Sequence, residues 1–140
     1  MIASTDEAFG LRLGRASAQY RVDYGWCTGV VGTRLLFTPE ARVTGLALDR
    51  VPAARLVQRI EGLGLHFPVV LLGAEHVFLA TDEAYDLPRG VDVVPLDALA
   101  LPPSRTPRGN SRWAVPPRRG ADLVPSPGTL LALLGRRAAD

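Results

Sequence analysis

Prolines, a glycine, arginines and a tryptophan follow one another in the stretch Leu101-Pro-Pro-Ser-Arg-Thr-Pro-Arg-Gly-Asn-Ser-Arg-Trp-Ala-Val-Pro-Pro117. Because proline fixes φ and has no backbone N–H, we expect the chain to leave a strand at Pro102. Gly109 marks a turn, and Trp113 marks the return to extended structure. The stretch therefore predicts a basic loop that is anchored at both ends.

Short apolar segments separated by glycines predict strands on the N-terminal side of this loop. The expected strands are residues 26–31, 34–37, 44–48, 67–72, 77–80, 91–94 and 98–101. The turn Gly73-Ala-Glu-His76 joins two of them as a hairpin. After the loop, Arg112 to Val115 is typical of an edge strand, because Pro116 and Pro117 cannot donate to a ladder.

Three segments have the spacing or the capping residues of helices. Ser4-Thr-Asp-Glu7 offers a cap and acidic residues for an N-terminal helix over about residues 5–20. A second helix begins at Pro52 and ends at a pair of glycines. Ser126-Pro127 caps a C-terminal helix over residues 126–138. The apolar side chains of this last helix are Leu130, Leu131, Leu133 and Leu134.

The predicted helices and strands do not alternate regularly, as they would in a doubly wound parallel sheet. We therefore expect a single α+β domain over residues 1–140, with one mixed, mainly antiparallel sheet and two or three flanking helices. A chain of this length can bury one core of that kind. Residues 118–125 are expected to connect the sheet to the last helix.

All sixteen basic residues are arginine, and they are unevenly distributed. Residues 1–103 hold nine arginines and twelve acidic residues, a net charge of −3, whereas residues 104–140 hold seven and two, a net charge of +5. This asymmetry suits a phosphate-bearing partner, and it is equally typical of a solvated arginine surface. Without a long apolar run or the basic start of a signal peptide, the sequence predicts a cytoplasmic protein with no membrane partner.

A longer pattern runs from Gly90-Val-Asp-Val-Val94 through Leu99-Ala-Leu-Pro-Pro-Ser104 to Gly109 and Trp113. It resembles the late part of the bifunctional DNA primase/polymerase N-terminal domain, known as the prim-pol domain. Glu75-His-Val-Phe78 is similar to a strand of that family that carries a histidine. The resemblance implies a prim-pol-like fold in a short, degenerate actinobacterial form.

The resemblance also implies catalytic roles for three residues. Asp49 matches the family's first metal-binding carboxylate, His76 its histidine, and Asp92 its third carboxylate, so Asp49 and Asp92 would hold Mg²⁺ or Mn²⁺ if any activity is retained. Val51 stands in place of the second carboxylate, although two-metal phosphoryl transfer needs closely spaced carboxylates. The family's substrate-loop lysine is missing too, and the arginines that could replace its charge are Arg34 and Arg42.

Charge and resemblance together predict a surface that binds DNA, RNA or a nucleotide. Trp113 is the candidate for stacking on a base. The candidates for phosphate contacts are Arg105, Arg108, Arg112, Arg118 and Arg119.

Each of these residues also has a structural role open to it. Asp49 can cap the following helix, and His76 can be a structural residue of the hairpin turn. Asp92 alternates with valines and can face solvent. Trp113 can pack in the core, and the arginines can be solvated loop charges.

The sequence leaves three functions open. The first is a reduced prim-pol-like module, without polymerase activity, that binds nucleic acid or a nucleotide weakly. The second is a non-catalytic interaction or dimerisation module that uses the leucines of the C-terminal helix. The third is a metal-dependent primase or nucleotidyltransferase, which Val51 disfavours.

Overall fold

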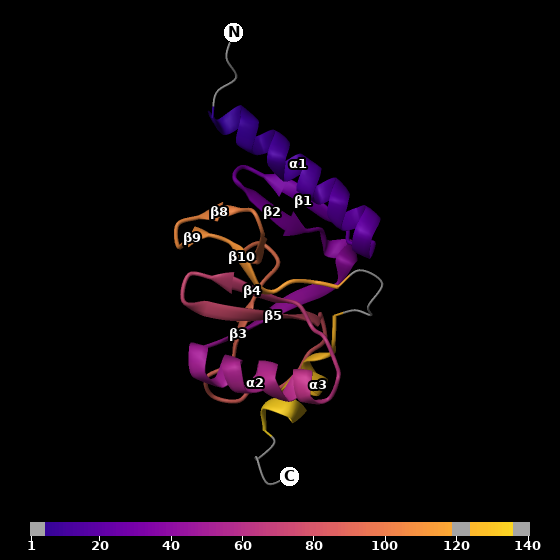
Figure 1. The fold of residues 1–140 in the computed structure, drawn as a ribbon, viewed down its shortest axis with the longest axis vertical. Coiled ribbons are helices and arrows are strands. Elements are labelled where there is room, and N and C mark those ends of the chain that lie inside the picture. The colour runs from indigo at the N-terminus through magenta and orange to yellow at the C-terminus, as the bar shows by residue number, and fades with distance from the viewer. Residues whose placement is uncertain (1–4, 119–123, 136–140) are drawn as a thin grey trace.

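The computed structural model describes residues 5–118 and 124–135. Four layers follow one another along the long axis of the molecule (Figure 1). They are helix α1 (Thr5–Tyr24), a three-stranded sheet, a five-stranded sheet, and the helices α2 (Arg50–Gly62) and α3 (Pro127–Leu134). The predicted α+β class is therefore confirmed. None of the described helices is long and apolar enough to cross a membrane.

The strands are divided among three sheets, where the sequence suggested a single one. The five-stranded sheet contains, in order, β10 (Arg112–Val115), β4 (Val69–Leu72), β5 (Glu75–Thr81), β3 (Val43–Leu48) and β6 (Asp92–Val94). The three-stranded sheet contains β1 (Thr28–Val31), β2 (Arg34–Phe37) and β7 (Ala100–Leu101), and a small hairpin pairs β8 (Arg105–Thr106) with β9 (Gly109–Asn110). A 3-10 helix, η1 (Pro39–Ala41), precedes β3. All these strand pairings are antiparallel.

The five-stranded sheet is built around a split β-α-β unit. β3 and β4 run parallel to each other, because both pair antiparallel with β5 between them. α2 connects β3 to β4, as in that motif. The connection 82–91 then brings the chain to β6 on the other side of β3.

Two hydrophobic clusters lie on opposite faces of this sheet. Alternate residues of a strand face opposite sides, so Ala47 of β3 joins the cluster that contains α1 and the three-stranded sheet. Leu46 and Leu48 join the second cluster, which contains residues of α2 and α3. All six residues of β3 are buried, because both faces of the strand are covered.

The C-terminal helix packs against its own chain. Leu130 and Leu133 are buried in the second cluster, and Leu131 and Leu134 pack against its margin. Arg59 of α2 donates from Nη1 to the carbonyl oxygens of Leu133 and Leu134, at 2.8 and 2.7 Å. The leucines that the sequence suggested as contacts for a partner therefore pack mostly against the rest of this chain.

Buried hydroxyl groups anchor the proline-rich stretch. Ser104 Oγ donates to the carbonyl oxygen of Leu101 at 2.5 Å and accepts from the N–H of Leu35 at 2.7 Å. Ser111 Oγ donates to the carbonyl oxygen of Ala100 at 2.6 Å. Between these anchors the chain forms the hairpin β8–β9, rather than an irregular loop.

Several predicted boundaries differ from the structure, among them the hairpin turn and the bounds of two helices. The turn after β4 is shorter than expected, because Gly73 adopts a φ of 61° and Glu75 already pairs with Leu72 in the strand ladder. α2 begins two residues before Pro52, since a proline is tolerated in the first helical turn, where the N–H has no helical acceptor. α1 extends to Tyr24.

Parts of two predicted segments lie outside the described residues. These parts are residues 119–123 of the expected connector and residues 136–138 of the expected C-terminal helix. The described part of that helix begins as predicted, because Ser126 Oγ accepts from the N–H of Thr129.

Candidate binding cavity between the two sheets

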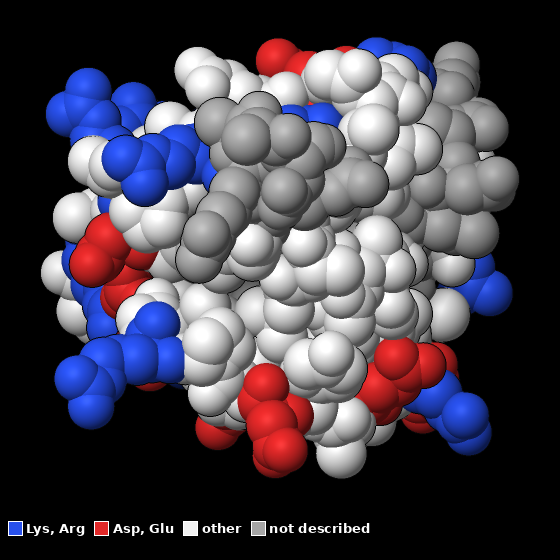
Figure 2. Space-filling view, turned by 90° about the horizontal axis from the view of Figure 1, so that it is seen from below, with Lys and Arg blue, Asp and Glu red and all other residues white. Residues whose placement is uncertain are grey.

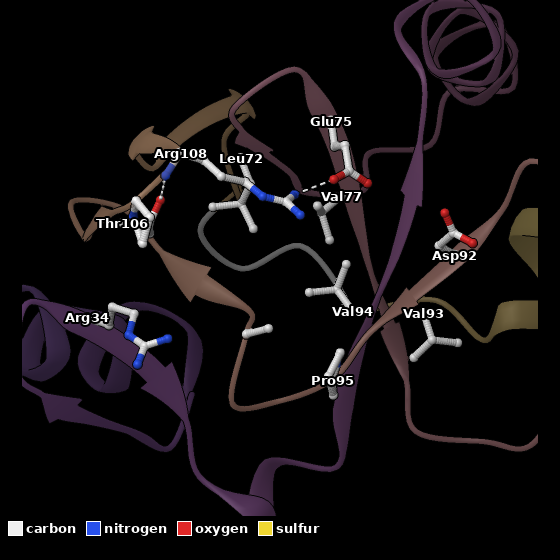
Figure 3. Close-up of a pocket in the computed structure, with 12 residues that line it drawn as sticks. Arg34, Leu72, Glu75, Val77, Asp92, Val93, Val94, Pro95, Thr106 and Arg108 are labelled. Carbon is white, nitrogen blue, oxygen red and sulfur yellow. Dashed lines mark hydrogen bonds and ion pairs between the residues drawn. The ribbon is translucent and has the colours of Figure 1, made fainter.

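A cavity of about 410 Å³ lies between the five-stranded and three-stranded sheets (Figure 3). The β4–β5 hairpin and β6 form one side, and β2 with the β8–β9 turn forms the other. Leu72, Val77 and Val94 contribute apolar surface. Cavities of this size with a few polar groups are typical of small-ligand sites.

Strand register explains why one wall of the cavity carries carboxylates. Val77 of β5 and Asp92 of β6 pair with Ala47 from its two sides. Side chains of paired residues project from the same face, so Val77 and Asp92 both face the three-stranded sheet. Glu75 lies two residues before Val77 and therefore faces the same way.

Two arginines reach the cavity from the opposite side. Arg108, in the β8–β9 turn, forms an ion pair with Glu75 (Figure 3). The pair is screened by solvent, since the two side chains are 63% and 32% exposed. Arg34 of β2 donates from Nη1 to the carbonyl oxygen of Asp97 at 3.3 Å. A guanidinium has five N–H donors, so these contacts leave further donors for a ligand.

The three residues that the resemblance places at a catalytic centre lie at one end of the five-stranded sheet but not on one face. His76 pairs with Leu48 and faces α2, whereas Asp92 faces the cavity. Asp49 is the N-cap residue of α2, although its side chain makes no capping hydrogen bond. Within residues 5–118 and 124–135, no three His, Cys, Asp or Glu side chains form a group that could hold a metal ion.

His76 lies on the face of the sheet that α2 covers. Its Nδ1 atom is buried and has no hydrogen-bond partner among the described residues. Leu71 and Arg112 continue the same row across β4 and β10, because Arg112 pairs with Leu71 and Leu71 pairs with His76. His76 and Arg112 therefore lie on the opposite face of the sheet from the cavity.

The arginines of the predicted binding surface are separated in space. Arg105 lies over the ring of Phe9 in α1, at 3.9 Å from its centroid, while Arg108 lines the cavity. Arg118 follows the other end of β10, where its Nη2 lies 3.3 Å from Nδ1 of His66. Arg119 lies outside the described residues.

Figure 2 views the molecule from the side of α2 and α3. On this face the arginines stand apart around the rim, with acidic residues between them, and the middle carries no charge that the figure shows. This view therefore shows no continuous arginine surface.

Trp113 packs against aromatic side chains instead of standing free. Its ring lies edge-on to Tyr20, with centroids 6.2 Å apart, and at the same distance from Trp26. Burial raises the pKa of Tyr20 to about 12, although a hydrogen bond with Trp113 opposes that rise. The Tyr20 hydroxyl donates to the carbonyl oxygen of Pro102 at 2.5 Å, so this cluster also holds the proline-rich stretch.

Sequence reasoning found part of this cavity. It singled out Asp92 and Arg108, and it offered Arg34 as one replacement for the missing lysine. It missed Glu75, which the expected four-residue turn placed outside the strand. Glu75 lies two residues before the buried Val77, and this alternate spacing was the signal that both side chains face the same side of the sheet. No known protein family, curated protein or solved structure shows a significant match to this chain.

Proposed function

We propose that the chain is a reduced prim-pol-like module, without polymerase activity, that binds a phosphate-bearing ligand in the cavity between its two sheets. The observation that carries this proposal is that Arg34 and Arg108 line one cavity from separate elements. Two guanidinium groups can grip the oxygens of one phosphate group with paired hydrogen bonds. Such a group belongs either to a nucleic acid or to a nucleotide.

The acidic side chains of the cavity would keep this binding weak. In the free protein Glu75 occupies one edge of the Arg108 guanidinium. A phosphate that binds Arg108 competes with that carboxylate, and Asp92 adds a second negative charge to the cavity lining. We therefore expect weak binding that depends strongly on salt, because exposed charge contacts are screened.

Binding of a fluorescently labelled single-stranded oligonucleotide, and of a labelled nucleoside triphosphate, tests the proposal. Arg34→Ala and Arg108→Ala should each weaken binding about tenfold, as expected for the loss of a charged hydrogen bond. Arg55→Ala, on the exposed surface of α2, removes the same charge elsewhere and should leave affinity nearly unchanged. Equal effects of all three substitutions would show that binding follows net charge and not the cavity.

A primer-synthesis assay with Mg²⁺ or Mn²⁺ tests the absence of polymerase activity. Wild type and Asp49→Ala should give the same background, because His76 and Asp92 face opposite sides of the sheet and Asp49 lies outside it, at the N-cap of α2. Product formed by the wild type alone would instead support the primase alternative.

A further inference from the structure

Helix α1 has a second apolar face that nothing in the described structure covers. Phe9, Leu13 and Tyr20 point into the first hydrophobic cluster. On the other side of the helix, Ala8, Leu11, Arg15, Ala18 and Val22 recur at positions i, i+3, i+7, i+10 and i+14, which places them in one row. We call this row the outer stripe of α1.

The outer stripe is exposed along its whole length. Leu11 and Val22 are 67% and 76% exposed, more than any other large apolar residue in the described part of the chain. The other members of the row, Ala8, Arg15 and Ala18, are also exposed. α1 forms one end of the molecule, and no other described element lies on its outer side (Figure 1). An apolar row at helical spacing is the pattern with which one helix packs on another.

Arginines determine which partner fits this stripe. Arg15 stands at its centre, and Arg12 and Arg21 stand on its two sides. All three arginines are exposed. A helix that carries acidic residues beside its own apolar row would match both the apolar and the charged positions.

A second copy of the chain does not meet this requirement. The stripe runs from Ala8 to Val22, and Arg15 is its midpoint. Antiparallel pairing of two copies would therefore place the two Arg15 side chains opposite each other, and a parallel pair in register would do the same. Like charges at facing positions oppose association.

We propose that the outer stripe of α1 is a docking surface for an acidic amphipathic helix of another protein. This surface lies at the far end of the molecule from α2 and does not include the cavity residues (Figure 1). The proposal is therefore independent of ligand binding between the sheets.

The test uses the full chain and a monomeric, helix-forming synthetic peptide whose leucine row is flanked by glutamates. A control peptide has the same leucine row flanked by lysines. Fluorescence anisotropy should show binding of the acidic peptide and at least about tenfold weaker binding of the basic one. Equal binding of both peptides would overturn the proposal, because it would reflect apolar contact without charge recognition.

Substitutions locate the binding surface. Leu11→Glu and Val22→Glu should each weaken binding of the acidic peptide about tenfold, because a carboxylate replaces an apolar contact and repels the acidic flanks of the peptide. Val51→Glu makes the same change at a residue of α2 that is 61% exposed and should have no effect, and Arg108→Ala should have none either. Circular dichroism of each variant checks that it is folded. Unchanged binding by folded Leu11→Glu and Val22→Glu would refute the proposal.

Sedimentation of the free protein tests the second-copy alternative. We expect a monomer at all concentrations that the peptide assay uses. A wild-type dimer that Leu11→Glu dissociates would assign the stripe to self-association and would overturn the proposal.

Discussion

Individual buried hydroxyl groups hold the proline-rich stretch in place, which explains part of its sequence. Ser104 is fully buried, and its Oγ links β7 to β2 by donating to Leu101 and accepting from Leu35. Tyr20 holds the neighbouring carbonyl group of Pro102. Ser104 and the neighbouring carbonyl group of Pro102 therefore have a structural role in this chain.

We predict that Ser104→Ala lowers the free energy of unfolding by about 1–3 kcal/mol, because the buried N–H of Leu35 loses its acceptor. Urea unfolding monitored by tryptophan fluorescence measures this. Thr33→Val is the matched control. Its hydroxyl also donates to a carbonyl oxygen of the same stretch, that of Arg105, but it is exposed and water can replace it. Similar losses for the two variants would contradict the role of burial.

The raised pKa of Tyr20 predicts that the domain loses stability at alkaline pH. Its pKa rises from 10.0 to about 12 on folding, so this contribution is complete below pH 10 and disappears as the pH rises to about 12. Two pKa units correspond to a loss on the order of 2–3 kcal/mol. Denaturant unfolding at several pH values should show this fall in the wild type. Tyr20→Phe keeps the ring without the ionisable group, and an equally steep fall in that variant would rule out Tyr20 as its cause.

Among the elements, α3 shows how an apolar helix can be misjudged from its sequence. The cap at Ser126 and the leucine spacing predict the helix, but they do not say whether its apolar side meets this chain or another. In the structure this chain itself covers the helix: its leucines join the second hydrophobic cluster, and Arg59, 74 residues before Leu133, donates to the carbonyl oxygen of Leu133. Hydrophobic periodicity marks a face that must be covered, without naming what covers it.

Leu130→Ala should therefore destabilise the domain itself. Leu130 is 1% exposed, and loss of a buried leucine costs about 2–5 kcal/mol. Leu11→Ala, at a position that is 67% exposed on α1, should change stability by less than about 0.5 kcal/mol. Chemical unfolding of both variants makes the comparison. Equal stability of Leu130→Ala and wild type would show that α3 is not part of the core in solution.

At the scale of the whole molecule, Gly45 permits the close packing beside the cavity. It lies in the middle of β3 and faces the three-stranded sheet. An added Cβ would come within 2.5 Å of Val77 Cγ1, 3.1 Å of Val94 Cβ and 3.3 Å of Leu99 Cδ1. The strand can pass there because the residue has no side chain.

We predict that Gly45→Ala destabilises the fold by about 1–3 kcal/mol through overpacking and weakens ligand binding in the adjacent cavity. Gly14→Ala is the control, and we expect it to change stability in the opposite direction. Nothing lies within 4 Å of a Cβ added at Gly14, and alanine should stabilise α1 by about 0.5–1 kcal/mol. Thermal unfolding of the two variants separates the steric effect of an added methyl group from its effect on the conformational freedom of the backbone. A stabilising Gly45→Ala would contradict the close packing.

The sequence by itself determined most elements of this protein, because strands, caps and turns depend on neighbouring residues. Alternating apolar residues, Ser126 with its proline, and the glycine turns predicted segments that the structure contains. The division into separate sheets could not be predicted, since it depends on which distant strands pair. The same is true of the site. His76 and Asp92 face opposite sides because of their register with β3, and Arg34 and Arg108 line one cavity only because β2 and the β8–β9 turn pack against the larger sheet. Local sequence sets the conformation of a segment, whereas long-range pairing decides which side chains share a cavity.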